Sequence, residues 1–191
     1  PAKADIVIPI PDSGNVAALG FSQASGIPLD YGFIRNHYVG RTFIMPSVGQ
    51  RNQSADMKLA VVPGVVRGKR IVVVDDSLIR GTTSRRRVAA LREAGAKEIH
   101  LRISCPPTRH PCYFGIDFPS RSELVAADHT VEEICKFIGA DSLAYLSVEG
   151  LRASVEHPSD FCNGCFTGTY PYAVAGELDK HALELTTEST N

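Results

Sequence analysis

Apolar residues occur in short runs separated by glycine- and proline-rich turns, and the most regular run lies near the middle of the chain. Residues 71–74 are Ile-Val-Val-Val, which predicts a strand buried on both faces. Two acids, Asp75 and Asp76, follow this run directly, and a Gly-Thr-Thr-Ser loop comes soon afterwards. The stretch 85–98 then places apolar residues at spacings of three, which predicts a helix that ends at Gly95.

The other apolar runs alternate between strand and helix patterns. We expect strands at residues 5–9, 32–35, 98–104 and 142–147. We expect helices at residues 15–23, 123–127, 131–138 and 148–155. This alternation is typical of an α/β fold with a mainly parallel sheet flanked by helices. In such sheets ligands bind at the carboxyl ends of the strands, which is where the two acids lie.

The loop at residues 80–84 has the composition of a phosphate site. Gly81 allows the backbone to approach an anion, the next three residues bring hydroxyl groups, and the following helix offers unpaired N–H groups. Adjacent acids would repel a bare phosphate, so we expect Asp75 and Asp76 to face a sugar diol or a hard cation such as Mg²⁺. The alternative is an ordinary strand-to-helix turn with solvated acids.

Two further stretches are candidates for anion binding. Asp12, Ser13 and Gly14 follow the first predicted strand and form either a second anion or metal site or an ordinary helix cap. Residues 35–60 form a long, basic and irregular segment with almost no acids. A segment of this kind is either a cationic lid over an anionic substrate or surface disorder.

The cysteines suggest a metal site rather than disulfides, because five cysteines in a chain expected to be cytoplasmic do not indicate a disulfide framework. Cys162 and Cys165 form a C-x-x-C pair, but two thiolates cannot complete a zinc or iron–sulfur site. Cys112, in a proline-flanked loop, is the best third candidate. Cys135 is expected to be a small core residue on an apolar helix face, and the role of Cys105 stays open.

Composition limits the classes of function. The chain has 191 residues, 43% of them apolar, and a formal charge of -1, so we expect one α/β core and no attraction to nucleic acid or anionic membranes. No apolar stretch approaches the ~20 residues that span a bilayer, and no signal peptide pattern is present, which predicts a cytoplasmic protein. The missing initiator Met predicts a piece of a longer chain. We divide it into a core at residues 1–157 and a C-terminal segment at residues 158–191.

Several of these motifs together resemble one family. A strand followed by two acids and Gly-Thr-Thr resembles the phosphoribosyl pyrophosphate signature of type I phosphoribosyltransferases, and the longer VDDSLIRGTTS resembles the amidophosphoribosyltransferases. The stretch RNHYVGRTFI resembles the flexible loop of that family. Its iron–sulfur branch is similar in two places, HPCYFGID and the C-x-x-C pair before FTGTYP. The resemblance implies a type I phosphoribosyltransferase fold with a flexible lid loop at about residues 35–60. It also implies an N-terminal glutaminase domain that is absent from this sequence.

The resemblance implies roles for individual residues. The pyrophosphate loop corresponds to Asp12, Ser13 and Gly14. The 5-phosphate loop corresponds to Arg80, Gly81, Thr82, Thr83 and Ser84. The lid contacts, which are the candidate catalytic residues, correspond to Tyr38, Arg41 and Lys58. The Mg²⁺ site is implied to involve Ser13, Asp75 and Asp76. The resemblance also implies three ligands of a [4Fe–4S] cluster, namely Cys112, Cys162 and Cys165. The fourth ligand lies outside this sequence unless Cys105 substitutes for it.

The implied activity is the first committed step of de novo purine synthesis. It converts phosphoribosyl pyrophosphate and ammonia, supplied from glutamine in the full enzyme, to 5-phosphoribosylamine and pyrophosphate. The family also implies purine nucleotides as feedback inhibitors and a tetramer. Two alternatives stay open: a phosphoribosyl pyrophosphate-sensing regulator that binds nucleic acid, and a nucleobase phosphoribosyltransferase. The first needs a basic face or a winged helix and the second an aromatic hood, and neither is located in this sequence.

Overall fold

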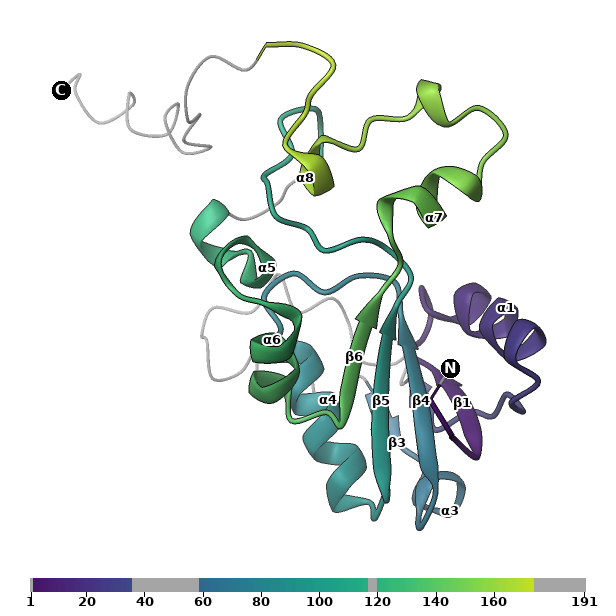
Figure 1. The fold of residues 1–191 in the computed structure, drawn as a ribbon. Helices are drawn as coiled ribbons and strands as arrows, with labels where there is room; N and C mark the ends of the chain where they lie inside the picture. Colours follow the sequence, from purple (N-terminus) through teal and green to yellow (C-terminus); the bar gives the residue numbers. More distant parts are fainter. Residues whose placement is uncertain (1, 36–58, 117–119, 174–191) are drawn as a thin grey trace, which may run out of the picture.

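The computed structural model describes residues 2–35, 59–116 and 120–173, and a four-stranded parallel sheet of order β1-β4-β5-β6 lies at its centre (Figure 1). Its strands are β1 (Ile6–Pro9), β4 (Arg70–Asp75), β5 (Glu98–Ile103) and β6 (Ser142–Tyr145). All four were predicted from the sequence. The predicted α/β fold class is therefore confirmed.

Helices cover both faces of this sheet (Figure 1). One face carries α4 (Thr82–Glu93), α5 (Val125–Asp128) and α6 (Val131–Ile138), and the other carries α1 (Asn15–Ser25). Strand β4 supplies side chains to both layers: Ile71 and Val73 belong to the large core under α4 and α6, whereas Val72 and Val74 pack with α1. Burial on both faces explains why this strand has no polar alternation.

A second, antiparallel sheet pairs β2 (Phe33–Arg35) with β3 (Leu59–Val61), and the short helix α3 (Pro63–Val66) follows. The strand predicted at residues 32–35 is confirmed. Most of the predicted lid loop, at about residues 35–60, lies outside the described residues, and Arg35, Leu59 and Ala60 at its two ends pair as strand residues. Three residues are too few to show a period-2 pattern, so β3 could not be predicted from the sequence.

The segment after β6 consists of α7 (Val148–Ala153), the 3₁₀ turn η3 (Pro158–Asp160) and α8 (Gly164–Thr167). The N–H groups of Arg109 and His110 donate to the Cys165 carbonyl at 2.9 and 3.0 Å, and the Tyr170 hydroxyl donates to the Pro111 carbonyl at 2.6 Å. These bonds attach α8 to the loop that follows β5. Residues 158–173 are therefore joined to the core at this loop.

Some predicted helix boundaries were wrong. Helix α4 begins at Thr82 rather than at residue 85, because Gly81 adopts a left-handed conformation (φ 75°) that turns the chain directly into the helix. The helix predicted at residues 123–127 is split into the 3₁₀ turn η2 (Arg121–Glu123) and α5. Helix α6 was predicted with the correct bounds, because its Thr130–Glu133 capping box and Gly139 mark both ends.

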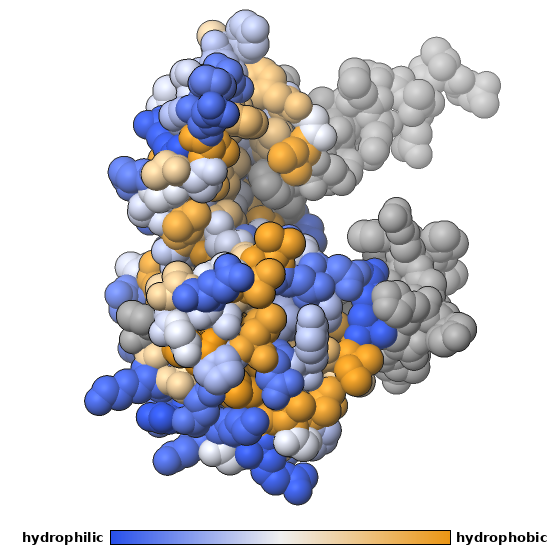
Figure 2. Space-filling model, turned by 90° about the vertical axis from the view of Figure 1, so that its right-hand side faces the viewer, coloured by the Kyte–Doolittle hydropathy of each residue, from blue (hydrophilic) through white to orange (hydrophobic). Residues whose placement is uncertain are grey.

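The surface on the α1 side mixes polar groups with exposed apolar side chains (Figure 2). Val16 and Leu19 of α1 are 81% and 47% exposed, and Ile34 of β2 is 59% exposed. Within the described part of the chain, no helix is both long enough and apolar enough to cross a membrane.

Two glycines of this region provide a matched stability test. A Cβ on Gly14 would lie 2.6 Å from the Val74 carbonyl oxygen and 2.7 Å from that of Ile10, whereas a Cβ on Gly20 within α1 meets nothing within 4 Å. We expect Gly14→Ala to lower the free energy of unfolding by about 2 kcal/mol, because backbone atoms must move apart. Gly20→Ala should raise it by about 0.5 kcal/mol, because alanine favours the helix. Urea unfolding of the two variants measures both values, and equal effects would contradict this packing.

Candidate active site

Two loops lie side by side at the carboxyl edge of the sheet because β1 and β4 are neighbours. The pairing of Pro9 with Val74 ends the ladder, and the Ile10 N–H then donates to the Val74 carbonyl at 2.8 Å. The Gly14 N–H donates back to the Ile10 carbonyl at 2.9 Å, which closes the first loop against the end of β4. Asp12 and Ser13 are exposed on this loop. The structure therefore brings the loop at residues 12–14 to the edge that carries the two acids.

Asp75 is the inward-facing acid of the pair and is only 4% exposed. Its Oδ1 accepts from the Asp76 backbone N–H at 3.0 Å, and its Oδ2 accepts from Arg87 Nη1 at 2.9 Å. Burial raises the pKa of the Asp75 carboxyl to about 6, even though Arg87 acts in the opposite direction. Both oxygens of this carboxylate are thus already engaged within the protein.

Asp76 has a different environment. Its side chain is half-buried, and its Oδ1 accepts from the Ser77 hydroxyl at 3.0 Å. Among the described residues, no basic side chain forms an ion pair with it. Asp76 is therefore the acid of this pair that is available to a ligand at the edge of the sheet.

The loop between β4 and α4 packs against α6 and leads directly into the first turn of α4. Gly81 lies against the Phe137 ring of α6, where an added Cβ would meet Cε1 at 3.2 Å. Thr82 and Thr83 are exposed at the first turn of the 12-residue helix α4, but Ser84 is only 5% exposed and faces the interior. The hydroxyl groups that the helix offers to an anion are therefore those of the two threonines.

A cavity of about 800 Å³ opens between the 12–14 loop, β2 and α4. Its lining includes three arginines, Arg35, Arg86 and Arg87, and the acids Asp12 and Glu93. Arg35 pairs with Asp12 at its edge. Arg86 and Arg87 were not predicted as site residues, although with Thr83 and Ala90 they follow the helical spacing that places side chains on one face.

The cysteines of the predicted metal site come from two segments that meet at α8. Cys112 follows the loop whose N–H groups bind the Cys165 carbonyl, and the Gly164 N–H donates to Cys162 Sγ at 3.5 Å. Burial raises the pKa of the Cys165 thiol, and the neighbouring thiols of Cys112 and Cys162 raise it further. The structure thus brings together the two segments that carry the three predicted cysteines. Residues 2–35, 59–116 and 120–173 contain no three His, Cys, Asp or Glu side chains preformed as ligands of one metal ion.

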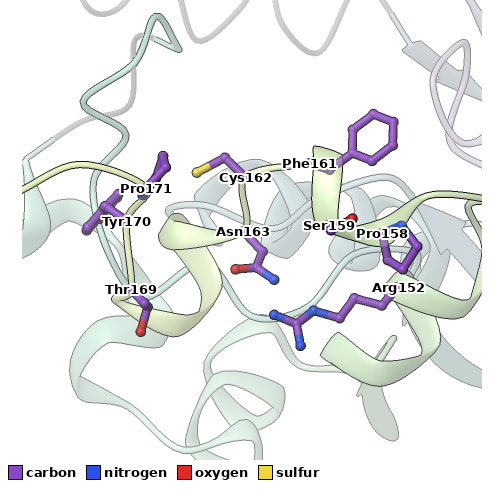
Figure 3. A pocket seen from close by; sticks show the side chains of 9 residues that line it. All are labelled: Arg152, Pro158, Ser159, Phe161, Cys162, Asn163, Thr169, Tyr170 and Pro171. Carbon is purple, nitrogen blue, oxygen red and sulfur yellow. The ribbon is translucent and has the colours of Figure 1, made fainter.

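A smaller cavity of about 460 Å³ lies beside Cys162 (Figure 3). The guanidinium group of Arg152 points toward Asn163, whose amide oxygen, when turned to face it, accepts from Nη2 at 2.7 Å and from Nε at 3.0 Å. Cys162 is itself exposed. The Cys162 thiol is therefore reachable from the protein surface.

Known proteins resemble the chain closely over part of their length. The amidophosphoribosyltransferase of Archaeoglobus fulgidus is 54% identical over 180 residues, which are 93% of this chain and 39% of that protein. The Bacillus subtilis amidophosphoribosyltransferase is 55% identical over 174 residues, 88% of this chain and 37% of that protein. The chain belongs to the amidophosphoribosyltransferase family. No protein-family model matches it.

Solved structures agree with this membership. A glutamine phosphoribosylpyrophosphate amidotransferase from B. subtilis, in complex with ADP and GMP, superimposes with a TM-score of 0.82 at 52% identity, over 93% of this chain and 40% of that one. A structure described as the allosteric regulatory enzyme of purine biosynthesis gives a TM-score of 0.82 at 51% identity, over 92% and 39%. The predicted type I phosphoribosyltransferase fold is confirmed. The chain spans about two fifths of the length of these amidophosphoribosyltransferases.

The structure describes one group of predicted site residues and leaves another group outside the described part of the chain. The residues of the 12–14 and 80–84 loops lie at the same sheet edge as Asp75 and Asp76. The predicted lid contacts Tyr38, Arg41 and Lys58 lie outside the described residues. Sequence reasoning missed Arg87, the partner of Asp75, and Glu123, the partner of Arg80. Both pairs join residues more than ten positions apart, which no local pattern reveals.

The buried Asp75 carboxyl gives a stability prediction with a defined sign. Its pKa is raised from 3.8 to about 6, so the folded protein holds this proton more tightly than the unfolded chain does. The resulting stabilisation is complete below pH 4 and is lost as the pH rises through 6. Asp75→Asn has no such loss, so its stability advantage over the wild type should grow by about 1 kcal/mol between pH 5 and pH 8.

Urea unfolding at the two pH values measures this change, with Asp160→Asn, an exposed acid in η3, as the control. The control should differ from the wild type by the same amount at both pH values. If the difference in unfolding free energy between Asp75→Asn and the wild type shrinks toward pH 8, the Asp75 carboxyl ionises more readily than its burial implies.

Proposed function

We propose that this chain is the phosphoribosyltransferase part of an enzyme that makes 5-phosphoribosylamine and pyrophosphate from phosphoribosyl pyrophosphate and ammonia. The single observation that carries this proposal is the meeting of two anion-binding loops beside Asp76 at one sheet edge. The names of relatives that are more than 50% identical support it. In the complete enzyme, a separate glutaminase domain would release the ammonia from glutamine.

The two loops divide the substrate between them. The 80–84 loop, with the Thr82 and Thr83 hydroxyls and the N-terminus of α4, would hold the 5-phosphate, and Asp76 would accept hydrogen bonds from the ribose hydroxyls. The 12–14 loop would hold the pyrophosphate. Nitrogen attacks C1 of the sugar as the bond from C1 to the pyrophosphate oxygen breaks, and a proton then leaves the nitrogen. Orientation and charge stabilisation carry this reaction, without a covalent enzyme nucleophile.

Mg²⁺ fits this edge through oxygen ligands. The exposed Ser13 hydroxyl and the available Asp76 carboxylate are oxygen donors of the kind that Mg²⁺ prefers. Asp75 fits less well as a direct ligand, because Arg87 and the Asp76 N–H already occupy its two oxygens. When bound, the ion would neutralise charge on the departing pyrophosphate. We therefore propose that Asp75 holds Arg87 and the Asp76 backbone in place at this site.

The three cysteines near α8 fit ligands of a [4Fe–4S] cluster. In such a cluster each thiolate binds its own iron atom, so the absence of a preformed single-ion site among the described residues does not conflict with it. Cys105, just beyond the end of β5, packs against the large core and is not included in this set. We propose Cys112, Cys162 and Cys165 as three ligands, with the fourth supplied from outside this chain.

Purine nucleotides are proposed as feedback inhibitors. The relative from B. subtilis was solved with ADP and GMP, and the 800 Å³ cavity beside the 12–14 loop carries three arginines that suit nucleotide phosphates. Assembly into a homo-oligomer is proposed from family membership alone.

The activity can be tested directly in the natural protein. Incubation with phosphoribosyl pyrophosphate, Mg²⁺ and an ammonium salt should release pyrophosphate in step with consumption of the sugar phosphate. Asp76→Asn should lower kcat/KM by about 100-fold, because a group that holds the reacting sugar is lost. Asp160→Asn is the control and should keep full activity. A folded wild-type protein that binds the substrate but releases no pyrophosphate would refute the proposed reaction.

The cluster can be tested by anaerobic iron and sulfide analysis of the natural protein. The wild type should contain about four iron and four sulfide per chain, as a [4Fe–4S] cluster requires. Cys112→Ser should lose most of this iron, because a serine hydroxyl is a poor substitute for a thiolate. Cys135→Ser should keep it, because the Cys135 thiol of α6 donates to the Ala140 carbonyl just beyond the helix and packs against the core. Iron-free wild-type protein would rule the cluster out.

A further inference from the structure

We propose that Glu123 is a positioning residue that orients Arg80 of the phosphate loop toward the 5-phosphate of the substrate. The inference deepens the proposed function and depends on it. It assigns a role to a residue that lies 43 positions from Arg80 in sequence and belongs to no recognised motif.

The contact between the two side chains has a defined geometry. Glu123 Oε1 accepts from Arg80 Nε at 3.0 Å and from Nη2 at 2.7 Å. These two nitrogens form one edge of the planar guanidinium group, so the carboxylate fixes the plane of the arginine. The second terminal nitrogen, Nη1, keeps its donors for another acceptor.

Stability alone does not account for this ion pair. The Arg80 and Glu123 side chains are 55% and 44% exposed, and exposed pairs of this kind contribute about 0 to 1 kcal/mol. The residues around Glu123, in contrast, are firmly held: Leu124 and Ala126 are 2% and 3% exposed. Glu123 is therefore an exposed acid on a rigid support.

The η2–α5 segment, which carries Glu123, also holds the phosphate loop through a hydrogen bond between the two backbones. The Val125 N–H donates to the Ile79 carbonyl at 2.9 Å, directly beside Arg80. Leu78, earlier in the loop, is 2% exposed and belongs to the large core. The loop and the η2–α5 segment thus meet at two points, one through the backbone and one through the Arg80–Glu123 pair. The position of the carboxylate relative to the loop is determined by both.

Preorganisation explains what the pair contributes. A free arginine side chain loses about 2 kcal/mol of rotamer entropy when it is fixed on a phosphate. Glu123 imposes this cost before the substrate arrives, because it already fixes the guanidinium group of Arg80, the residue that precedes Gly81 at the start of α4. The carboxylate also opposes the negative charge of the phosphate. Since it occupies the Nε edge and leaves Nη1 available, the arginine can contact the phosphate without breaking the pair, and orientation outweighs repulsion.

The test measures steady-state kinetics of the natural protein with Mg²⁺ and saturating ammonium. We expect Glu123→Ala to raise the KM for phosphoribosyl pyrophosphate about tenfold and to change kcat less than about twofold, because ground-state contacts to a remote phosphate are lost. Glu123→Gln keeps an oxygen acceptor and should recover part of the loss. Glu156→Gln, an exposed acid in the turn after α7, is the matched control and should leave KM unchanged.

A double-mutant cycle separates positioning from a general structural effect. In an Arg80→Ala background, Glu123→Ala should have no further effect on KM, because the carboxylate acts only through the arginine. An equal effect in both backgrounds would overturn the proposal. A lowered KM in Glu123→Ala would also overturn it, because Glu123 would then restrain Arg80 instead of presenting it.

Binding measurements keep this test distinct from that of the reaction. Calorimetric titration with phosphoribosyl pyrophosphate and Mg²⁺ gives the dissociation constant of each variant without turnover. A wild type that binds but releases no pyrophosphate contradicts the proposed reaction only, whereas an unchanged dissociation constant in Glu123→Ala contradicts the role of Glu123 only.

Discussion

The parallel pairing of β1 with β4 is the constraint on which the site depends. It places the ends of two strands, distant in sequence, side by side, and the Ile10–Val74 hydrogen bond continues the pairing into the first loop. Gly14 allows that loop to lie directly on the carbonyl of Val74. The two candidate anion-binding loops therefore have fixed relative positions before any ligand binds. Preorganisation of this kind reduces the entropy that binding must overcome.

The adjacent acids at the end of β4 show how one motif acquires two environments. Asp75 is the last residue of β4, whereas Asp76 lies just beyond the strand, so the two acids have different surroundings. The first is buried against Arg87 and carries a raised pKa, whereas the second stays at the edge beside Ser77. A buried ionised carboxylate lowers stability unless it is paired, and the pairing with Arg87 reduces that cost. Two identical residues thus offer a ligand different properties.

Local patterns in the sequence were sufficient for most of the framework. The apolar run at residues 71–74 and the apolar spacing at residues 131–138 each reflect physics within a few residues, and each prediction placed its element correctly. The start of α4 was predicted three residues too late, at residue 85. The missed features have a different origin. Strand β3, the inward turn of Asp75 and the Arg80–Glu123 pair all depend on contacts between distant segments, which periodicity does not encode. The cysteines form an intermediate case, since their spacing suggested a common site and only the fold brought Cys112 to α8.

The backbone contact between the first loop and β4 has a consequence for ligand selection. Neighbouring strands in a sheet are separated by about 4.8 Å, and this spacing is set by main-chain hydrogen bonds that no single side chain can adjust. Because the two loops continue from adjacent strands, the span between them is fixed in the same way. The sheet edge therefore selects ligands with two anionic ends by their length. A molecule of the right length contacts both loops, whereas a shorter one contacts only one loop and leaves the other solvated.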